Sequence, residues 1–279
     1  MVVAAGRHLG ALSCPTPTFC ATLDDLGTAY TFDGGSWSAG QALVAGATTP
    51  SKVIVSCTGP TFCVAAPTGN QVDVWTGTWG SPVVLVAAQR LQALSCATPK
   101  FCMAIDAQGA TFVYDGTRWY GVSGAPAGPG DVSCPGVSFC AATVSDSMGL
   151  WEGTSWISQS GVDSTGQLLS VSCPSATFCI AGDSDGAVIE WNGISWSPPV
   201  TIDPSTSTTT ADNVLTGVSC AGTTFCVAVD STGRALVYNG QAWSAPTRVG
   251  AGAALAAVSC PSSTFCLTAD AAGDVYSYR

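Results

Sequence analysis

The pattern Ser-Cys-x-x-x-x-Phe-Cys occurs seven times along this 279-residue chain and contains all 14 of its cysteines. Successive copies begin 43, 39, 38, 39, 47 and 40 residues apart. A period near 40 residues is typical of repeat architectures, in which each unit covers the apolar face of its neighbours. We therefore expect residues 1–279 to form one domain of seven similar units, although the length alone would also allow two smaller domains.

Each unit predicts four short antiparallel strands. An apolar strand ends in Ser-Cys, a second begins with Phe-Cys, and a third runs to an aromatic residue. Asp-Gly or Asn-Gly usually follows, as in tight hairpins where glycine tolerates a positive φ, and a tryptophan then starts the fourth strand in six units. These features predict an all-β, seven-bladed β-propeller with blades starting near residues 12, 55, 94, 132, 171, 218 and 258. A β-solenoid is the alternative, but it needs atypical units at both ends, which this sequence lacks.

The two ends of the chain complement each other. The seventh unit ends after its third strand, and residues 1–8 precede the first strand of unit one. We expect residues 1–8 to complete blade seven, with residues 2–5 pairing alongside residues 274–278 to close the ring. Two further departures from the repeat predict an exposed Ser/Thr-rich loop over residues 199–214 and an enlarged turn over residues 144–149.

The cysteines predict one disulfide inside every unit. Two cysteines six residues apart lie opposite each other on the two strands that flank the turn, and closing such a loop contributes roughly 2 kcal/mol. Zinc prefers pairs with two to four intervening residues, whereas every pair here has five, and His8 is the single histidine. We expect no metal and no cofactor. The predicted pairs are Cys14 with Cys20, Cys57 with Cys63, Cys96 with Cys102, Cys134 with Cys140, Cys173 with Cys179, Cys220 with Cys226, and Cys260 with Cys266.

Seven disulfides predict an oxidising compartment, and hence a secreted or cell-surface protein. Residues 1–8 lack the apolar core of a signal peptide, so we expect the export signal to be absent from this chain. The net charge of −10 and eight scattered Lys and Arg residues argue against binding to nucleic acid. No apolar run approaches the roughly 18 residues of a membrane span, so no membrane insertion is expected.

The candidate catalytic groups favour a non-enzymatic protein. The seven serines that precede the first cysteines cannot share one histidine as a base, so we expect them to bond backbone groups between blades. Aspartates recur in step with the repeat, which indicates turn capping rather than a glycosidase carboxyl pair. The segment from Asp183 to Gly186 comes closest to a calcium loop, but it lacks further carboxylates.

The recurring aromatic and turn residues leave two interpretations open. The rings either pack between blades or stack on sugars, with the turn side chains supplying hydrogen bonds. We take carbohydrate recognition through repeated weak sites as the leading hypothesis, and a structural or protein-interaction scaffold of a surface assembly as the alternative. The partners would be glycans or surface proteins, and the sequence indicates no oligomeric state. The candidate binding residues are Trp37, Trp79, Trp119, Trp156, Trp196, Trp243, Asp33, Asp115, Asn192 and Asn239.

The unit resembles the Cys-rich SC-x4-FC-x-A-x-D-x-x-G and Y-x-G-x-x-W repeats of exported proteins from actinobacteria and related bacteria. The resemblance covers nearly the whole chain and implies a secreted or surface-exposed bacterial propeller, without implying an activity. Unit two departs from the pattern with Pro67 at the turn aspartate and a shorter Trp75-to-Trp79 segment, and unit seven lacks the tryptophan. Tryptophan-rich propeller lectins are similar in outline, which implies sugar sites between blades at the level of the fold only.

Overall fold

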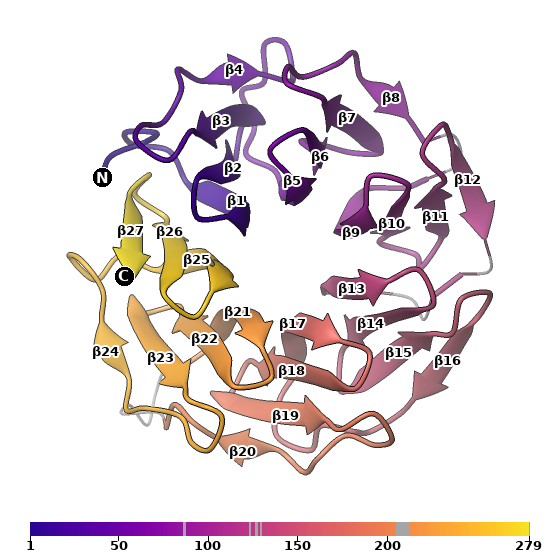
Figure 1. Cartoon of the computed structure of the whole chain (residues 1–279), viewed down its shortest axis with the longest axis vertical. Helices are drawn as coiled ribbons and strands as arrows, with labels where there is room; N and C mark the ends of the chain where they lie inside the picture. Colours follow the sequence, from indigo (N-terminus) through magenta and orange to yellow (C-terminus); the bar gives the residue numbers. More distant parts are fainter. Residues whose placement is uncertain (86–87, 123, 126–127, 129, 205–212, 279) are drawn as a thin grey trace.

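The computed structural model describes residues 1–85, 88–122, 124–125, 128, 130–204 and 213–278. Over these residues the chain forms 27 β-strands and no helix. The strands are arranged as seven antiparallel sheets in a ring around a central channel, as Figure 1 shows. The predicted seven-bladed β-propeller is therefore confirmed.

The blades follow the order of the chain, and within each blade the strands are ordered from the channel outward. Blades one to three contain β1 (Leu9–Thr16), β2 (Phe19–Asp24), β3 (Thr28–Phe32), β4 (Gln41–Ala42), β5 (Ile54–Gly59), β6 (Phe62–Ala66), β7 (Gln71–Trp75), β8 (Val83–Val84), β9 (Leu91–Thr98), β10 (Phe101–Asp106), β11 (Thr111–Tyr114) and β12 (Trp119–Val122). Blades four and five contain β13 (Val132–Gly136), β14 (Phe139–Val144), β15 (Ser147–Trp151), β16 (Trp156–Gln159), β17 (Leu168–Ser175), β18 (Phe178–Asp183), β19 (Ala187–Trp191) and β20 (Val200–Thr201). Blades six and seven contain β21 (Leu215–Gly222), β22 (Phe225–Asp230), β23 (Arg234–Tyr238), β24 (Thr247–Arg248), β25 (Leu255–Ser262), β26 (Phe265–Asp270) and β27 (Val275–Tyr278).

In every blade except the fourth, the second strand is the most buried element. In β2, β10, β18, β22 and β26 every residue is buried, because both faces of the strand contact a neighbouring blade. These strands read as almost continuous apolar runs, as expected for strands covered on both faces. The core consequently consists of seven clusters, one at each interface between blades.

The fourth strands differ from the prediction. Tryptophan begins a regular fourth strand only in blades three and four, at Trp119 and Trp156. In blades one, two, five and six the tryptophan makes a single bridge to the aromatic residue of the third strand, and a two-residue strand follows later. In blades two, five and six proline follows the tryptophan within three residues, and proline cannot donate to a β-ladder.

The ring closes where the two ends of the chain lie side by side (Figure 1). Val2 forms a bridge with Asp274, and the amide of Val275 donates to the carbonyl of Met1 at 2.8 Å. Ala4 is buried in the cluster between blades seven and one. The predicted pairing of residues 2–5 with residues 274–278 is found only at the beginning of β27.

The enlarged turn that we expected over residues 144–149 is wrong. Ser145 and Asp146 alone connect β14 to β15, and Gly149 lies within β15, paired with Ala142. Ser145 has a φ of 56°, the left-handed conformation that a tight two-residue hairpin requires. Of the long loop expected over residues 199–214, residues 205–212 lie outside the described residues.

Candidate functional site

Each blade is cross-linked by a disulfide between its first and second strands. The structure pairs all 14 cysteines within their own units, with Cα–Cα distances of 3.9–4.1 Å. The predicted intra-unit disulfides are confirmed, and the cysteines are therefore structural. Seven disulfides indicate that the protein works in an oxidising environment. In the described part of the chain, no helix is long and apolar enough to cross a membrane.

The second cysteine of each disulfide lies deep in the core, a depth that the spacing of the pairs did not predict. Cys266 is 3% exposed, and the second cysteines of the other six blades have no exposed surface. A ligand in solution cannot reach the six second cysteines without exposed surface, and each disulfide joins two strands of its own blade. The six cysteines without exposed surface are Cys20, Cys63, Cys102, Cys140, Cys179 and Cys226.

The seven serines before the first cysteines form a closed belt of hydrogen bonds. Each hydroxyl accepts the amide N–H of the first cysteine in the next blade, so that Ser13 binds Cys57 and Ser259 binds Cys14. All seven distances lie between 2.8 and 3.0 Å. The predicted role between blades is confirmed.

The six candidate tryptophans pack between blades. Each ring contacts the aromatic ring of the third strand in its own blade, with centroid separations of 5.4–5.7 Å. Trp79 is buried, and the other five are half-buried against the interface clusters. The indole N–H groups of Trp119, Trp156 and Trp196 are covered from solvent. The sugar-stacking role of these rings stays a prediction.

The four candidate turn residues Asp33, Asp115, Asn192 and Asn239 are exposed and lie at hairpin tips. One side-chain oxygen of each accepts the amides two and three residues ahead, at 2.8–3.0 Å. These hydrogen bonds stabilise the carboxylate, so the pKa of Asp33 is lowered, and the Thr117 hydroxyl helps to lower that of Asp115 to about 2. The acceptor oxygens are thus engaged within the turns.

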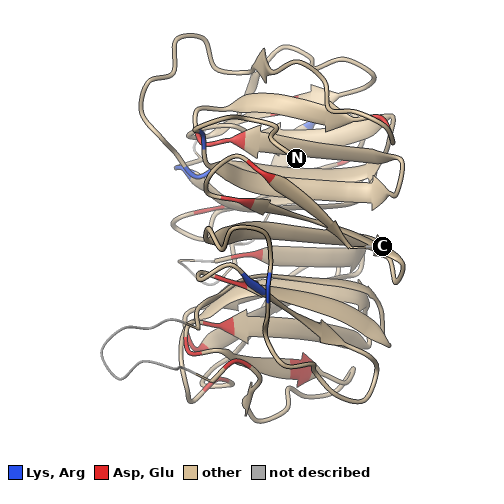
Figure 2. Cartoon of the chain, turned by 90° about the vertical axis from the view of Figure 1, so that its left-hand side faces the viewer, with Lys and Arg blue, Asp and Glu red and all other residues tan. Residues whose placement is uncertain are grey.

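Aspartates at the ends of five second strands have the same structural role. In Asp24, Asp106, Asp183, Asp230 and Asp270, Oδ1 accepts the amides two and four residues ahead at 2.7–3.0 Å. Among the described residues, no three His, Cys, Asp or Glu side chains come together as a metal site. Figure 2 shows that most acidic positions lie toward one side of the disc, where the second strands end.

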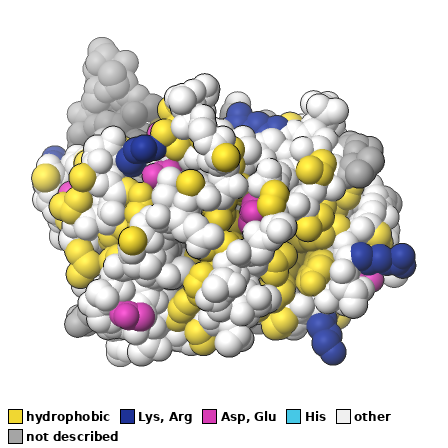
Figure 3. Space-filling view, turned by 90° about the horizontal axis from the view of Figure 1, so that it is seen from above, with side chains coloured by type: hydrophobic (Ala, Val, Ile, Leu, Met, Phe, Trp, Pro, Cys, Tyr) yellow, Lys and Arg dark blue, Asp and Glu magenta, His cyan; other side chains and the backbone are white. Residues whose placement is uncertain are grey.

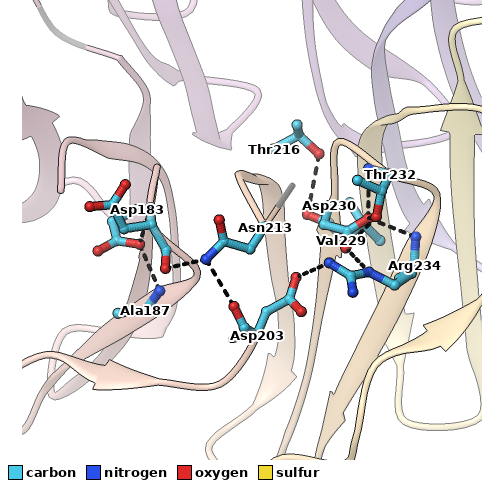
Figure 4. Close-up of polar contacts among 10 residues, drawn as sticks. Asp183, Ala187, Asp203, Asn213, Thr216, Val229, Asp230, Thr232 and Arg234 are labelled. Atoms are coloured by element: carbon cyan, nitrogen blue, oxygen red, sulfur yellow. Dashed lines mark hydrogen bonds and ion pairs between the residues drawn. The ribbon is translucent and has the colours of Figure 1, made fainter. Parts of the chain in front are cut away.

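A buried ion-pair network connects blades five and six near one of these aspartates. The Arg234 guanidinium contacts Asp230 on its own hairpin and Asp203 on the preceding connection (Figure 4). Both carboxylates are fully buried, whereas the arginine side chain is 17% exposed. The amide of Asn213 donates to the carbonyl of Asp203 at 3.0 Å and holds the same connection. Sequence reasoning missed this network because nothing in the repeat pairs residues 203 and 234.

A further departure from the repeat lies at the central channel. Asp131 occupies a position where most other blades have Ala, Gly or Ile, and its carboxylate accepts the amide of Val171 at 3.0 Å. Burial raises the pKa of Asp131. Nearby, the Lys52 ammonium donates to the carbonyl of Gly130 at 2.8 Å. The first contact joins blade four to blade five, and the second joins blade two to blade four across the channel.

Blade seven differs most from the other blades, because its sheet has only three described strands. Clusters at the other six interfaces each contain one of the candidate tryptophans, but the cluster between blades six and seven contains none. At that interface lies a groove of about 300 Å³. We call it the blade-seven groove, and its walls include Val227, Val237, Val249, Val258, Tyr276 and Tyr278.

The groove is an apolar feature of a surface with few charges. Tyr278 is 46% exposed at its rim, and the remaining polar groups of the walls are hydroxyls such as those of Ser244 and Ser277. Figure 3 shows that another part of the rim carries apolar side chains in narrow strips among mostly uncharged groups. The chain has only 9% charged residues in total. The sequence signalled this groove only through the missing tryptophan of unit seven.

Comparisons with known proteins show the fold. No protein-family model matches the chain, and no curated protein matches it. Solved structures similar to the chain include U3-55K, with a TM-score of 0.79, 8% identity and coverage of 96% of this chain and 89% of that one. YCF48 bound to D1 peptide has a TM-score of 0.77 and 13% identity, covering 100% of this chain and 93% of that one. The WD40 β-propeller domain of Doa1 has a TM-score of 0.75 and 10% identity, covering 100% and 95%.

These similarities show the β-propeller fold, and in this chain every blade also carries a cysteine pair. The resemblance to bacterial exported repeats rests on the sequence motifs alone. Identities of 8–13% carry no residue roles from those proteins to this chain.

Proposed function

We propose that the chain is a non-enzymatic protein-interaction scaffold, secreted or held at the cell surface, that binds an extended peptide segment in the blade-seven groove. The groove carries this proposal. It combines valine and tyrosine walls with the edge of β27, whose residues beyond Val275 have no strand beside them among the described residues. Apolar walls with tyrosine at the rim are typical of the core of a protein interface.

The chemistry of the groove favours a peptide over a sugar. A sugar site needs several hydrogen-bonding side chains around an aromatic platform, whereas the walls offer mainly methyl groups and ring faces. A peptide in extended conformation satisfies its own polar backbone by pairing with a strand edge. In the predicted sugar-binding turns one side-chain oxygen of each residue is already engaged by backbone amides, as at Asp33 and Asn192.

Similar folds also support a binding role. One similar propeller was solved as YCF48 bound to D1 peptide, and others are described as WD40 propellers. A rigid propeller can bind a partner in its loops and grooves without a change of conformation. The seven disulfides and the belt of serine hydrogen bonds would keep such a scaffold rigid outside the cell.

The proposal can be tested by offering the oxidised protein two ligand sets in parallel. A display library of random peptides and a glycan array would be screened against residues 1–279 on the same support. We expect saturable binding of a family of peptides and no glycan binding. Glycan binding without peptide enrichment would instead support the lectin hypothesis. A protein with reduced and alkylated cysteines is the control, because loss of the fold should abolish specific binding.

A further inference from the structure

In three blades the outer edge of the third strand is hydrogen-bonded to the segment that follows the next hairpin. In blades one, five and six a Trp-Ser dipeptide follows the hairpin, at Trp37-Ser38, Trp196-Ser197 and Trp243-Ser244. The serine amide donates to the carbonyl of the third strand at 2.8 Å, to Thr31, Glu190 and Val237 respectively. The serine hydroxyl accepts the amide of the same third-strand residue at 3.0 Å. We call this pair of bonds, with the stacked indole ring, the Trp–Ser clip.

Blade seven has the third-strand residue of this clip, but its described residues include no Trp-Ser segment bonded to it. Ser277 is paired with Leu267, the residue after the second cysteine, just as Val237 is paired with Val227 in blade six. The amide and carbonyl of Val275 point outward to Met1, and in a β-strand those of Ser277 then point outward too. Among the described residues, no partner occupies the outward groups of Ser277.

The blade-seven groove lies where the missing indole ring would pack. In blade six, Trp243 contacts Tyr238 and packs into the cluster shared with blade five. The corresponding position in blade seven lies beside Tyr278 and faces blade six. There the structure has the cavity of about 300 Å³ walled by Val237, Val249 and Tyr278. Ser277 lines this cavity and also the neighbouring cavity toward blade one, so the unpaired edge runs between two apolar hollows.

We propose that the blade-seven groove is a strand-addition site for a partner protein's extended segment that carries Trp-Ser. The segment runs antiparallel to β27, its tryptophan opposite Tyr278 and its serine opposite Ser277, and it completes the seventh Trp–Ser clip. This inference rests on the proposed function and names its ligand. Main-chain pairing supplies part of the affinity, and the tryptophan in its pocket supplies the specificity.

The register sets the length of the segment. Val2 is bridged to Asp274 and Met1 is bonded to Val275, so residues opposite Tyr276, Ser277 and Tyr278 are the ones still open. In blade six, Thr247 pairs with Ala235 as Met1 bonds to Val275, and two residues separate Thr247 from Ser244. The segment therefore comprises Trp, Ser and two further residues. A second copy of this chain is a poor donor, because its own three Trp-Ser dipeptides are already engaged in their blades.

A peptide copied from blade six tests the proposal. Residues 239–246, Asn-Gly-Gln-Ala-Trp-Ser-Ala-Pro, contain the clip and the two residues that follow it in blade six. The amidated peptide would be titrated into oxidised residues 1–279, with calorimetry for affinity and amide hydrogen exchange for location. We expect saturable one-to-one binding and slower exchange at the Ser277 amide. Replacing the peptide tryptophan with alanine should weaken binding at least about tenfold, as the loss of an anchoring aromatic residue does.

Two changes separate strand addition from simple apolar docking. Methylating the peptide's serine amide removes the donor to the Ser277 carbonyl without altering the indole ring. Ser277→Pro removes the outward donor of the protein, and its bonds with β26 survive because proline is tolerated at a strand edge. Both changes should weaken binding by about tenfold, a typical loss for one hydrogen bond with its desolvated partner. Thr31→Pro is the matched control, since it disrupts the occupied clip of blade one and should leave peptide binding unchanged.

The outcomes distinguish this inference from the proposed function. Equal binding of the methylated peptide, or of Ser277→Pro with an unchanged melting temperature, would overturn strand addition. So would concentration-dependent dimerisation that protects the Ser277 amide and is insensitive to the peptide. If library peptides bind but neither compete with the clip peptide nor protect Ser277, the scaffold function stands and the site is wrong. If no peptide binds at all, both proposals fail.

Discussion

At the scale of single residues, we expect substitution of Arg234 to destabilise the folded protein strongly. It is the cation that contacts two fully buried carboxylates, Asp203 at 3.0 Å and Asp230 through its Nε (Figure 4). Removing one partner of a buried ion pair leaves an uncompensated charge and costs about 3–5 kcal/mol. We expect Arg234→Ala to lower the free energy of unfolding in urea by that amount. Arg118→Ala, which loses an ion pair with an 80% exposed arginine, should change it by less than about 0.5 kcal/mol.

Equal losses of unfolding free energy in the two variants would show that Arg234 contributes no more than a surface residue.

The same region marks a limit of sequence analysis at this scale. The Asp-Gly and Asn-Gly turns were predictable because a side chain such as Asn192 bonds amides only two or three residues away. Asp203 and Arg234 are 31 residues apart, and their contact depends on how two blades dock. No local pattern encodes such a contact.

At the scale of elements, the first strands are tied into a ring by the serine belt. Ser133→Ala should therefore affect two blades at once. It removes the acceptor of the Cys173 amide, a bond of 2.9 Å, and a buried donor without a partner costs about 1–3 kcal/mol. We expect a loss of that size in urea unfolding of the oxidised protein. Ser164→Ala, at an exposed position, is the control, and an equal effect there would contradict a structural role for the belt.

The sequence predicted the strands whose side chains enter the core in every blade, because those residues recur in every unit. Phe-Cys begins each second strand because both side chains enter the core, as Phe101 and Cys102 do. The fourth strands were less predictable, since Trp119 continues into a ladder while Trp196 is followed by two prolines. The missing tryptophan of unit seven was visible in the sequence. The groove it leaves depends on the distance between blades six and seven, which the sequence does not contain.

At the scale of the whole molecule, acid pKa values shift in opposite directions in the interior and at the rim. Burial raises the pKa of Asp73, Asp131 and Asp183. Beside Asp183, the single proton of the Thr165 hydroxyl cannot serve both Asp163 at 2.6 Å and Asp183 at 2.7 Å. Backbone and hydroxyl donors lower the pKa of Asp33 and Asp115 at the exposed turns. The folded protein therefore holds interior protons more tightly than the unfolded chain.

These shifts predict a stability maximum in mildly acidic solution. An aspartate with a raised folded pKa contributes stability that is present below its usual value of 3.8 and is lost as the pH rises through the folded pKa. Asp33 and Asp115 work in the opposite sense, because a lowered pKa contributes stability that is lost only as the pH falls below the usual value of 3.8. For Asp115 that loss extends to about pH 2. A net charge of −10 at pH 7 adds repulsion that protonation relieves. The urea midpoint should consequently rise as the pH falls from 7 to 5.

Asp183→Asn isolates the interior part of this effect. Its Oδ1 would still accept the amides of Asp185 and Ala187, and its new amide group could donate to the Thr165 hydroxyl. The variant should be more stable than the wild type at pH 7 and should show a shallower rise toward pH 5. Asp33→Asn is the control, because Asn192 and Asn239 already form this kind of turn, and it should leave the slope between pH 7 and 5 unchanged. An unchanged slope in Asp183→Asn would mean that the acidic stabilisation comes from net charge rather than from Asp183.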